Sequence, residues 1–459
     1  MRVYGESFIG EKFVSHIWDG GHFAKDALRA KDGRKIEVIS RGQWNYDSGA
    51  DFRNAEIKVG DQVQKGDVEI HVRYSHWRVH HHDVNPRYNS TILHVVMWDD
   101  GIKLLTRKQN GELIPTLILC DYLDSSIGKL WKTIEGGEEE PSPCRTKAET
   151  MTLQSIGKVL DRAGMDRFAR KTKVFGDRLQ EIGEDQLLYE GIMEALGYSK
   201  NKKPFLELAR KVPLENLMGQ PPKKIQAILF GVAGLLPSQS YGQVTSDEET
   251  EEYVSKIEAL WKPSSSQFKS QRMSEEQWEF FRTRPENFPT RRISGISYII
   301  SNSKNGNGSE SLLSMFLPSF EEGDKVSRSL RKILMPRASG YWTNHYTFGG
   351  RDHREKTFLI GHSRAADIVI NVILPVVSAY ARRLRNEELQ QAVTAVYTKH
   401  ARLQDNKITR YLAGQIFSNR EECSSVVNSA MRQQGLIHIY RSFCTAGDCR
   451  NCPLTGTNM

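Results

Sequence analysis

The chain has 459 residues, of which 38% are hydrophobic, 26% charged and 9% aromatic. This length is enough for two or three domains with separate apolar cores, and the composition is that of an ordinary globular protein. No stretch approaches the roughly 18 apolar residues that span a bilayer. Residues 1–13 (MRVYGESFIGEKF) lack the apolar segment of a secretion signal. We therefore expect a cytoplasmic protein with no membrane partner.

Lysine and arginine outnumber aspartate and glutamate by 64 to 56, which gives a formal net charge of +8. Many globular proteins of this size are equally basic. The overall charge therefore favours an anionic partner such as nucleic acid only slightly, and local clusters of charge are more informative.

The first 120 residues have the pattern of a mixed α/β structure. Apolar residues recur at helical spacing from Phe8 to Trp18. Strand-like runs with turn residues between them follow at 35–39, 52–59, 66–74, 90–98 and 114–119. A short segment between the third and fourth runs could be helical. The sequence therefore predicts an α+β fold, with a mixed sheet and flanking helices in residues 1–135.

A change of pattern follows the acidic, proline-containing stretch GGEEEPSPC (136–144), which has the composition of a linker. Residues 145–420 show long helical periodicity and predict a mostly helical domain. Its most apolar helix covers 364–386, and Pro375 should kink it. Residues 421–459 are predicted to form a separate cysteine-bearing tail.

A β-hairpin is predicted to bring acidic residues together in the N-terminal domain. If Gly60 and Asp61 form its tip, paired residue numbers sum to about 120 or 121, so Asp51 faces the neighbourhood of Glu69. Side chains alternate along a strand, so Glu69 and His71 should project from one face, while Val68, Ile70 and Val72 point into the core.

Two close carboxylates are unfavourable in a buried site unless a cation neutralises them. Oxygen ligands suit Mg²⁺ or Mn²⁺, and such an ion can polarise a phosphate and activate water. The hairpin therefore predicts a metal-dependent nuclease-like centre. The alternative is a solvated strand face on which polar residues merely alternate with apolar ones.

An Asp at the start of one strand and Glu-x-Lys on the next, within an α-β-β-β-α-β core, is the signature of PD-(D/E)XK nucleases. The sequence resembles this superfamily at Gly49-Ala50-Asp51 and Glu69-Ile70-His71. The resemblance implies Mg²⁺- or Mn²⁺-dependent cleavage of DNA or RNA, with Asp51 and Glu69 as ligands. His71 replaces the usual Lys, and its imidazole would orient water as a base or stabilise charge as an imidazolium.

The whole chain is also similar to an uncharacterised bacterial family of domains of unknown function. Long segments support this similarity, among them NYDSGADFRNAEI and GDVEIHVRYSHWRVHHHD. That family supplies no activity, so the nuclease interpretation depends on the hairpin.

Further polar residues lie close to the hairpin in sequence. Glu37, on the strand before Asp51, is a candidate third acidic ligand or a solvated carboxylate. Three adjacent histidines follow the Glu-x-His strand and cannot all face one site. We expect His80 or His82 to approach the metal or the phosphate, with a solvated turn as the alternative.

Three cysteines near the end of the chain are spaced C-x4-C-x2-C, at Cys444, Cys449 and Cys452. Such spacing can wrap one metal ion or cluster, and a fourth ligand is then required. Cys144 is the preferred fourth ligand, and Cys423 and His438 are the alternatives.

The arrangement resembles iron–sulfur nucleases of the helicase-nuclease and CRISPR-adaptation types, in which a 4Fe–4S cluster joins the chain ends. A structural zinc ion would suit the same residues. The remaining alternative is that the three cysteines bind no metal.

Arginines interleaved with aromatic residues form a candidate nucleic-acid groove, because arginine binds phosphate and aromatic rings stack on bases. The alternative is an ordinary surface of salt bridges. The candidate residues are Arg282, Arg284, Arg291, Arg292, Arg351 and Arg354.

Two other functions compete with the nuclease. TFLIGHSRAAD (357–367) resembles the nucleophile elbow of a serine hydrolase, with Ser363 as nucleophile, although the surrounding pattern is helical. Alternatively, the chain is a non-catalytic nucleic-acid-binding protein in which His71 marks the loss of chemistry.

Overall fold

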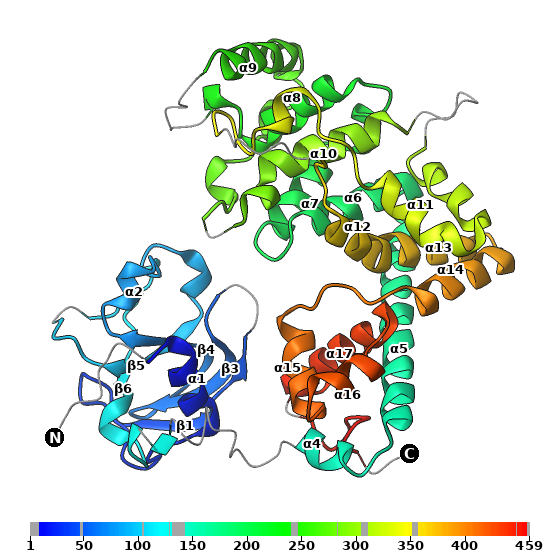
Figure 1. Cartoon of the computed structure of the whole chain (residues 1–459). Helices are drawn as coiled ribbons and strands as arrows, with labels where there is room; N and C mark the ends of the chain where they lie inside the picture. The colour runs from blue at the N-terminus through cyan, green and yellow to red at the C-terminus, as the bar shows by residue number, and fades with distance from the viewer. Residues whose placement is uncertain are drawn as a thin grey trace. The chain divides into compact units, whose positions relative to one another are not determined.

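The computed structural model describes residues 9–45, 49–102, 105–127, 129–130, 143–239, 247–281, 283–303, 311–350, 357–446 and 448–456. The chain divides into two compact units (Figure 1). The first contains Met1–Thr150, Gly414–Ile416 and Ile439–Met459, and the second contains Met151–Ala413 and Phe417–His438. The last residues therefore join the N-terminal unit, whereas the sequence suggested a tail of its own.

The first unit is built on a six-stranded sheet in the order β1-β3-β4-β5-β6, with β2 also paired to β3. The strands are β1 (Ile36–Ser40), β2 (Gln43–Trp44), β3 (Phe52–Val59), β4 (Gln62–Arg73), β5 (Thr91–Trp98) and β6 (Thr116–Ile118). Strands β1 to β4 pair antiparallel, and β4-β5-β6 pair parallel. This confirms the α+β class and the mixed sheet. Strand β2 was not predicted, because two residues are too few to show a period.

The hairpin has the predicted register. Gly60 and Asp61 form the turn, Val59 pairs with Gln62, and Phe52 pairs with Val68. The register shifts by one residue between Phe52 and Ala55. Asn54 lies within this bulge and has a φ of 56°, a left-handed conformation that asparagine tolerates better than most residues.

Helix α1 (Glu11–Gly20) packs its apolar side into the core of the first unit. Phe13, Val14, Ile17 and Trp18 are buried in the same cluster as the apolar residues of β4. Gly21 ends the helix in a left-handed conformation, with φ 69°, and donates to the carbonyls of Ile17 and Trp18. A short helix, α2 (His76–Val79), lies between β4 and β5. Helix α4 (Pro143–Ala148) belongs to the same unit.

The regular secondary structure of the second unit, where the structure describes it, consists of helices, with isolated bridges and no sheet. Its core gathers large buried side chains such as Tyr189, Phe230, Phe316 and Trp342. The helices from α5 onward are α5 (Leu153–Leu179), α6 (Glu184–Leu196), α7 (Lys202–Lys211), α8 (Pro222–Ala233), α9 (Glu248–Trp261), α10 (Pro289–Ser301), α11 (Val326–Ile333), α12 (His362–Ile368), α13 (Leu374–Arg383), α14 (Glu387–Lys399), α15 (Lys407–Ile416), α16 (Arg420–Val426) and α17 (Ala430–Ser442).

One continuous helix, His362–Arg383, is long and apolar enough to cross a membrane by length and composition alone. It is mostly buried inside the second unit, as the core helix of a water-soluble protein would be, so it is weak support for a membrane span. A π-helical turn, η14 (Val369–Ile373), interrupts it just before Pro375. This irregularity lies where the proline removes a backbone donor, and the kink at Pro375 stays a prediction.

Candidate metal centre

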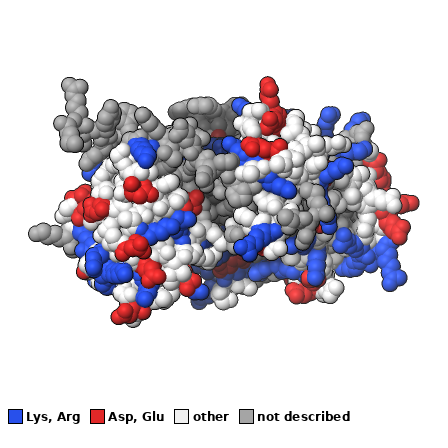
Figure 2. All heavy atoms as spheres, turned by 90° about the horizontal axis from the view of Figure 1, so that it is seen from below, with Lys and Arg blue, Asp and Glu red and all other residues white. Residues whose placement is uncertain are grey.

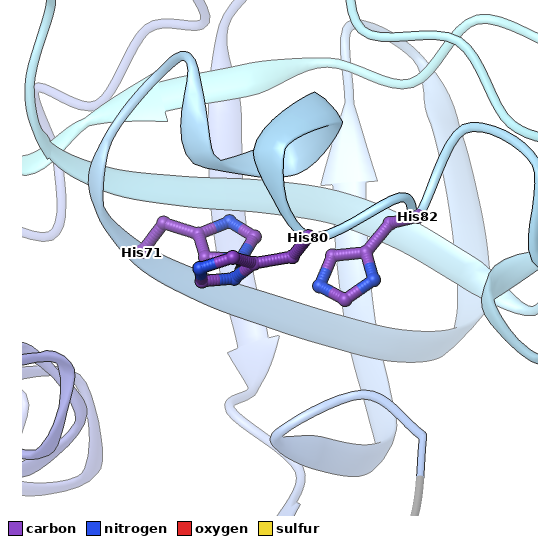
Figure 3. A group of neighbouring side chains, drawn as sticks. All are labelled: His71, His80 and His82. Atoms are coloured by element: carbon purple, nitrogen blue, oxygen red, sulfur yellow. Dashed lines mark hydrogen bonds between the residues drawn. The ribbon is translucent and has the colours of Figure 1, made fainter. Parts of the chain in front are cut away.

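Carboxylate and imidazole groups from several elements converge beside β4. This strand supplies Glu69 and His71, and the segment from α2 to the following turn supplies His80 and His82. The nearest ring nitrogens of His71, His80 and His82 all lie within 4.8 Å of one another. Figure 3 shows the three rings grouped together, with His80 directly against His71.

The conformation of His81 explains how two of three adjacent histidines reach one site. His81 has a φ of 58°, in the left-handed region, and its own side chain is exposed. The turn is held by hydrogen bonds from the His81 amide to Arg78 O and from the His82 amide to Trp77 O. The chain therefore turns sharply at His81, and both neighbouring rings face inward. The sequence suggested only that His80 or His82 would approach the site.

Asp51 and Glu69 are linked by hydrogen bonds that backbone amides donate to their carboxylates. The Asp51 amide donates to Glu69 Oε2 at 3.0 Å, and the Ile70 amide donates to Asp51 Oδ2 at 3.1 Å. The other Glu69 oxygen, Oε1, lies 3.0 Å from His82 Nε2 and 3.6 Å from His71 Nε2. The predicted convergence of Asp51, Glu69 and His71 is confirmed. Glu69 presents one oxygen to two ring nitrogens, and Asp51 orients it.

A buried polar chain lies behind His71. His71 Nδ1 is 2.9 Å from His94 Nε2, and His94 Nδ1 is 3.3 Å from the Thr106 hydroxyl. Thr106 Oγ1 is in turn 2.8 Å from Thr116 Oγ1. If His71 Nδ1 donates to His94, the Nε2 lone pair of His71 faces His80 Nδ1 and Glu69 Oε1. Histidines that bind metals are usually fixed in this way by a group on their other nitrogen.

The electrostatics of the site disfavour charge in the absence of a cation. Burial, and then the Asp51 carboxylate, raise the pKa of Glu69 well above its usual value. Burial, and then the neighbouring histidines beginning with His94, lower the pKa of His71 well below its usual value. Burial also lowers the pKa of His94 to about 3. A divalent cation would reverse the cost at Glu69 and would use the neutral imidazoles as ligands.

The donor set fits a divalent transition metal. One carboxylate oxygen and two or three imidazole nitrogens suit Zn²⁺, Mn²⁺ or Fe²⁺, whereas Mg²⁺ prefers oxygen ligands and retained waters. Glu69 is 5% exposed and His71 1% exposed as whole residues, so a bound ion would be largely withdrawn from solvent on this side.

The chain matches one protein family over most of its length. Residues 11–406 match DUF2851, a family described as protein of unknown function. The chain belongs to this family. The match contains the whole candidate centre and Cys144 but ends before the three C-terminal cysteines. No curated protein and no solved structure matches the chain. These comparisons give no support to the likeness to PD-(D/E)XK nucleases.

Glu37 is not part of the DUF2851 centre. It is exposed on β1 and pairs with Lys58, seven residues along β3 from Asp51. At about 3.3 Å per residue this places it roughly 20 Å away. The prediction of Glu37 as a ligand is therefore wrong, because the strand carries it toward the hairpin tip rather than toward the site.

The predicted arginine groove is wrong for two of its residues, which are buried. Arg291 and Arg292 are 1% and 2% exposed and cannot meet nucleic acid on a surface. Arg291 donates to the carbonyls of Trp342, His345 and Phe358, and Arg292 to Leu359 O, the Tyr198 hydroxyl and Asn287 Oδ1. Both arginines hold loops of the second unit together.

Arg284 is exposed, and Arg282, Arg351 and Arg354 lie outside the described residues. On the face shown in Figure 2, basic and acidic side chains are interspersed. Charge therefore does not single out a nucleic-acid surface on that face.

The cysteines of the predicted tail site share a unit with Cys144. Cys144, on α4, and Cys452 are buried, Cys444 is half-buried and Cys449 is exposed, and all four are free thiols. Burial, and then the Cys452 and Cys449 thiols, raise the pKa of Cys144 to about 11. The alternative ligands, Cys423 and His438, belong to the second unit. Cys144 as the fourth ligand stays a prediction.

Ser363 does not have the setting of a nucleophile elbow. It is exposed in the first turn of α12, and the described residues before it form an isolated bridge at Phe358 instead of a strand. A serine hydrolase presents its nucleophile on a turn between a sheet strand and a helix, and the described part of the second unit contains no sheet.

Proposed function

We propose that this DUF2851 protein is a metal-dependent hydrolase that cleaves phosphodiester bonds in nucleic acid. Its metal ligands are Glu69, His71 and His82, with His80 beside them. One observation carries the proposal: Glu69 Oε1 lies within 3.6 Å of both His71 Nε2 and His82 Nε2 in a buried site.

Two carboxylate-bearing residues have different roles in this proposal. Glu69 binds the ion through Oε1 while the Asp51 amide holds Oε2. Asp51 positions Glu69 and the β4 backbone, because its own Oδ2 accepts from the Ile70 amide. The sequence assigned Asp51 a ligand role. In this proposal Asp51 has a positioning role instead, because its amide donates to Glu69 Oε2 and its carboxylate accepts from the Ile70 amide.

His94 fixes the tautomer that metal binding needs. Its low pKa keeps the ring neutral at physiological pH, so Nε2 can accept the His71 Nδ1 proton. His71 then presents a lone pair at Nε2. A bound divalent ion would polarise a phosphate oxygen and lower the pKa of a coordinated water, which supplies the nucleophile for hydrolysis.

The choice of a phosphodiester substrate depends on charge around the site. The segment that supplies His80 and His82 also carries Arg78 and Arg87, both exposed. Arginine forms paired hydrogen bonds with phosphate oxygens, so a segment with these exposed arginines favours an anionic backbone as the substrate. The net charge of +8 acts in the same direction.

The test is cleavage of single- and double-stranded DNA and RNA by the full chain with Mn²⁺, Zn²⁺, Fe²⁺ or Mg²⁺. We expect Glu69→Gln and His71→Asn to reduce the rate more than about 100-fold, because each removes a ligand. Glu37→Gln, an exposed carboxylate on the same sheet, is the matched control and should retain full activity.

Equal cleavage by Glu69→Gln and the wild type would overturn the proposal. Metal-independent binding of nucleic acid without cleavage under any of these ions would instead indicate a non-catalytic binding protein.

A further inference from the structure

A second group of metal-binding side chains lies at the solvent side of the centre. Glu11, His76 and His80 each offer a ligand atom, and these three atoms lie within 4.8 Å of one another. Glu11 Oε1 is 3.5 Å from His76 Nδ1 and 3.7 Å from His80 Nδ1. Like the inner group of Glu69, His71 and His82, this outer group combines one carboxylate with two imidazoles.

Local structure holds the outer group together. His76 begins α2, and the His80 amide donates to His76 O at 2.9 Å, so the two rings stand four residues apart on one face of a helical turn. Their ring centroids are 5.3 Å apart. Glu11 comes from the first turn of α1, which packs in the core of the same unit. Two histidines at this spacing plus one glutamate form a familiar zinc-binding combination.

The inner and outer groups are contiguous through His80. His80 Nδ1 lies 3.1 Å from His71 Nε2, on the inner side, and 3.7 Å from Glu11 Oε1, on the outer side. Centres with two metals hold their ions close together, so that both contact the substrate phosphate. His80 occupies the position between two such ions.

We propose that the centre binds two divalent transition-metal ions, one held by Glu69, His71 and His82 and the other by Glu11, His76 and His80. This inference extends the proposed hydrolase, but it concerns metal binding and is tested without reference to cleavage. Each ion receives three protein ligands, which leaves open positions for water or a phosphate oxygen.

Exposure separates the two positions. The side chains of Glu69, His71 and His82 are 6%, 1% and 8% exposed. Those of Glu11, His76 and His80 are 43%, 29% and 19% exposed. The inner ion should therefore bind more tightly and exchange more slowly. The outer ion should bind more weakly and meet the substrate, because solvent and a phosphodiester reach it directly.

The test is titration of the metal-free full chain with Mn²⁺, monitored by calorimetry. The bound Mn²⁺ is then counted by metal analysis after gel filtration. Mn²⁺ is used because the cysteine thiolates prefer softer ions and would complicate a zinc count. The wild type should bind two Mn²⁺ with affinities at least about tenfold apart, and its Mn²⁺ electron paramagnetic resonance spectrum should show coupling between two ions.

Variants assign each binding event. Glu11→Gln and His76→Asn should lose the weaker site and the coupling while keeping the tighter site. Glu69→Gln should lose the tighter site. His81→Asn is the matched control, because that histidine is exposed, belongs to neither group and has a left-handed backbone that asparagine accepts. Circular dichroism confirms that each variant is folded.

One bound Mn²⁺ in the wild type, or two that persist with unchanged affinity in both Glu11→Gln and His76→Asn, would overturn the inference. Glu11 would then only form ordinary ion pairs with two histidines. Two bound ions without any cleavage would refute the proposed hydrolase and leave the two-metal centre standing.

Discussion

Acidification should destabilise the metal-free first unit through His94. The unfolded chain protonates this histidine near pH 6.5, whereas burial lowers the pKa in the folded state to about 3. Below pH 6.5 the unfolded state therefore binds more protons, and the free energy of unfolding falls as the pH falls. Each pH unit is worth about 1.4 kcal/mol, so His94 alone should remove about 2 kcal/mol between pH 7 and pH 5.

Glu69 opposes this trend. Its pKa is raised in the folded state, so its contribution to stability is present below its unfolded value and is lost as the pH rises through the folded value. The slope of the wild type alone therefore mixes several groups. Comparison with His94→Gln isolates one of them, because the glutamine keeps polar atoms in the site but does not titrate.

The measurement is urea unfolding at pH 7, 6 and 5 in the presence of a chelator. Hydrogen exchange of peptides from β4 and β5 is the readout, because these strands report on the first unit. The wild type should lose about 2 kcal/mol more than His94→Gln between pH 7 and pH 5. His81→Asn removes an exposed histidine and should show the wild-type slope. Parallel slopes for the wild type and His94→Gln would refute the argument that His94 is neutral in the folded protein.

Three further outcomes follow from the contacts. Asp51→Ala should weaken metal binding about 10- to 100-fold in a Mn²⁺ titration, because the carboxylate that accepts from the Ile70 amide, next to Glu69, is lost. Arg291→Met should lower the free energy of unfolding of the second unit by about 3 kcal/mol or more, since buried carbonyls lose their donors, while Arg284→Gln changes it by less than about 0.5 kcal/mol. Anaerobic purification should give a brown iron–sulfur protein or a colourless zinc protein, and Cys144→Ser and Cys452→Ser should each remove that metal and lower the melting temperature.

The hairpin could be predicted from sequence because its information is local. A Gly-Asp turn between two strands of alternating polarity determines the register, and the register determines that Glu69 and His71 share a face. The same logic correctly placed Asp51 beside Glu69. It gave the wrong result for Glu37, whose strand had no predicted partner and therefore no predicted register.

Other members of the centre could not be found in this way. Glu11 reaches the site only because α1 packs on the sheet, which is a tertiary contact. The left-handed turn at His81 could not be predicted, because no glycine or other turn-forming residue marks this position. His94 did leave a signal, since it is a single ionisable residue in the apolar strand TILHVVMW, where a polar side chain needs a buried partner. The prediction of a nucleic-acid groove failed for the buried arginines of 280–293, because an arginine that binds carbonyls has the same sequence pattern as one that binds phosphate.

The electrostatic cost of burying Glu69 and His71 together favours a metal ion at this site. Burial of Glu69 beside Asp51 favours a protonated carboxyl, and burial of His71 among other histidines favours neutral rings. A purely structural network in this position would be replaced by apolar residues with little loss of stability, because buried ionisable groups seldom stabilise a fold on their own. A divalent cation would change this balance: it would neutralise Glu69, accept the lone pairs of His71 and His82, and favour the tautomer in which His71 donates to His94.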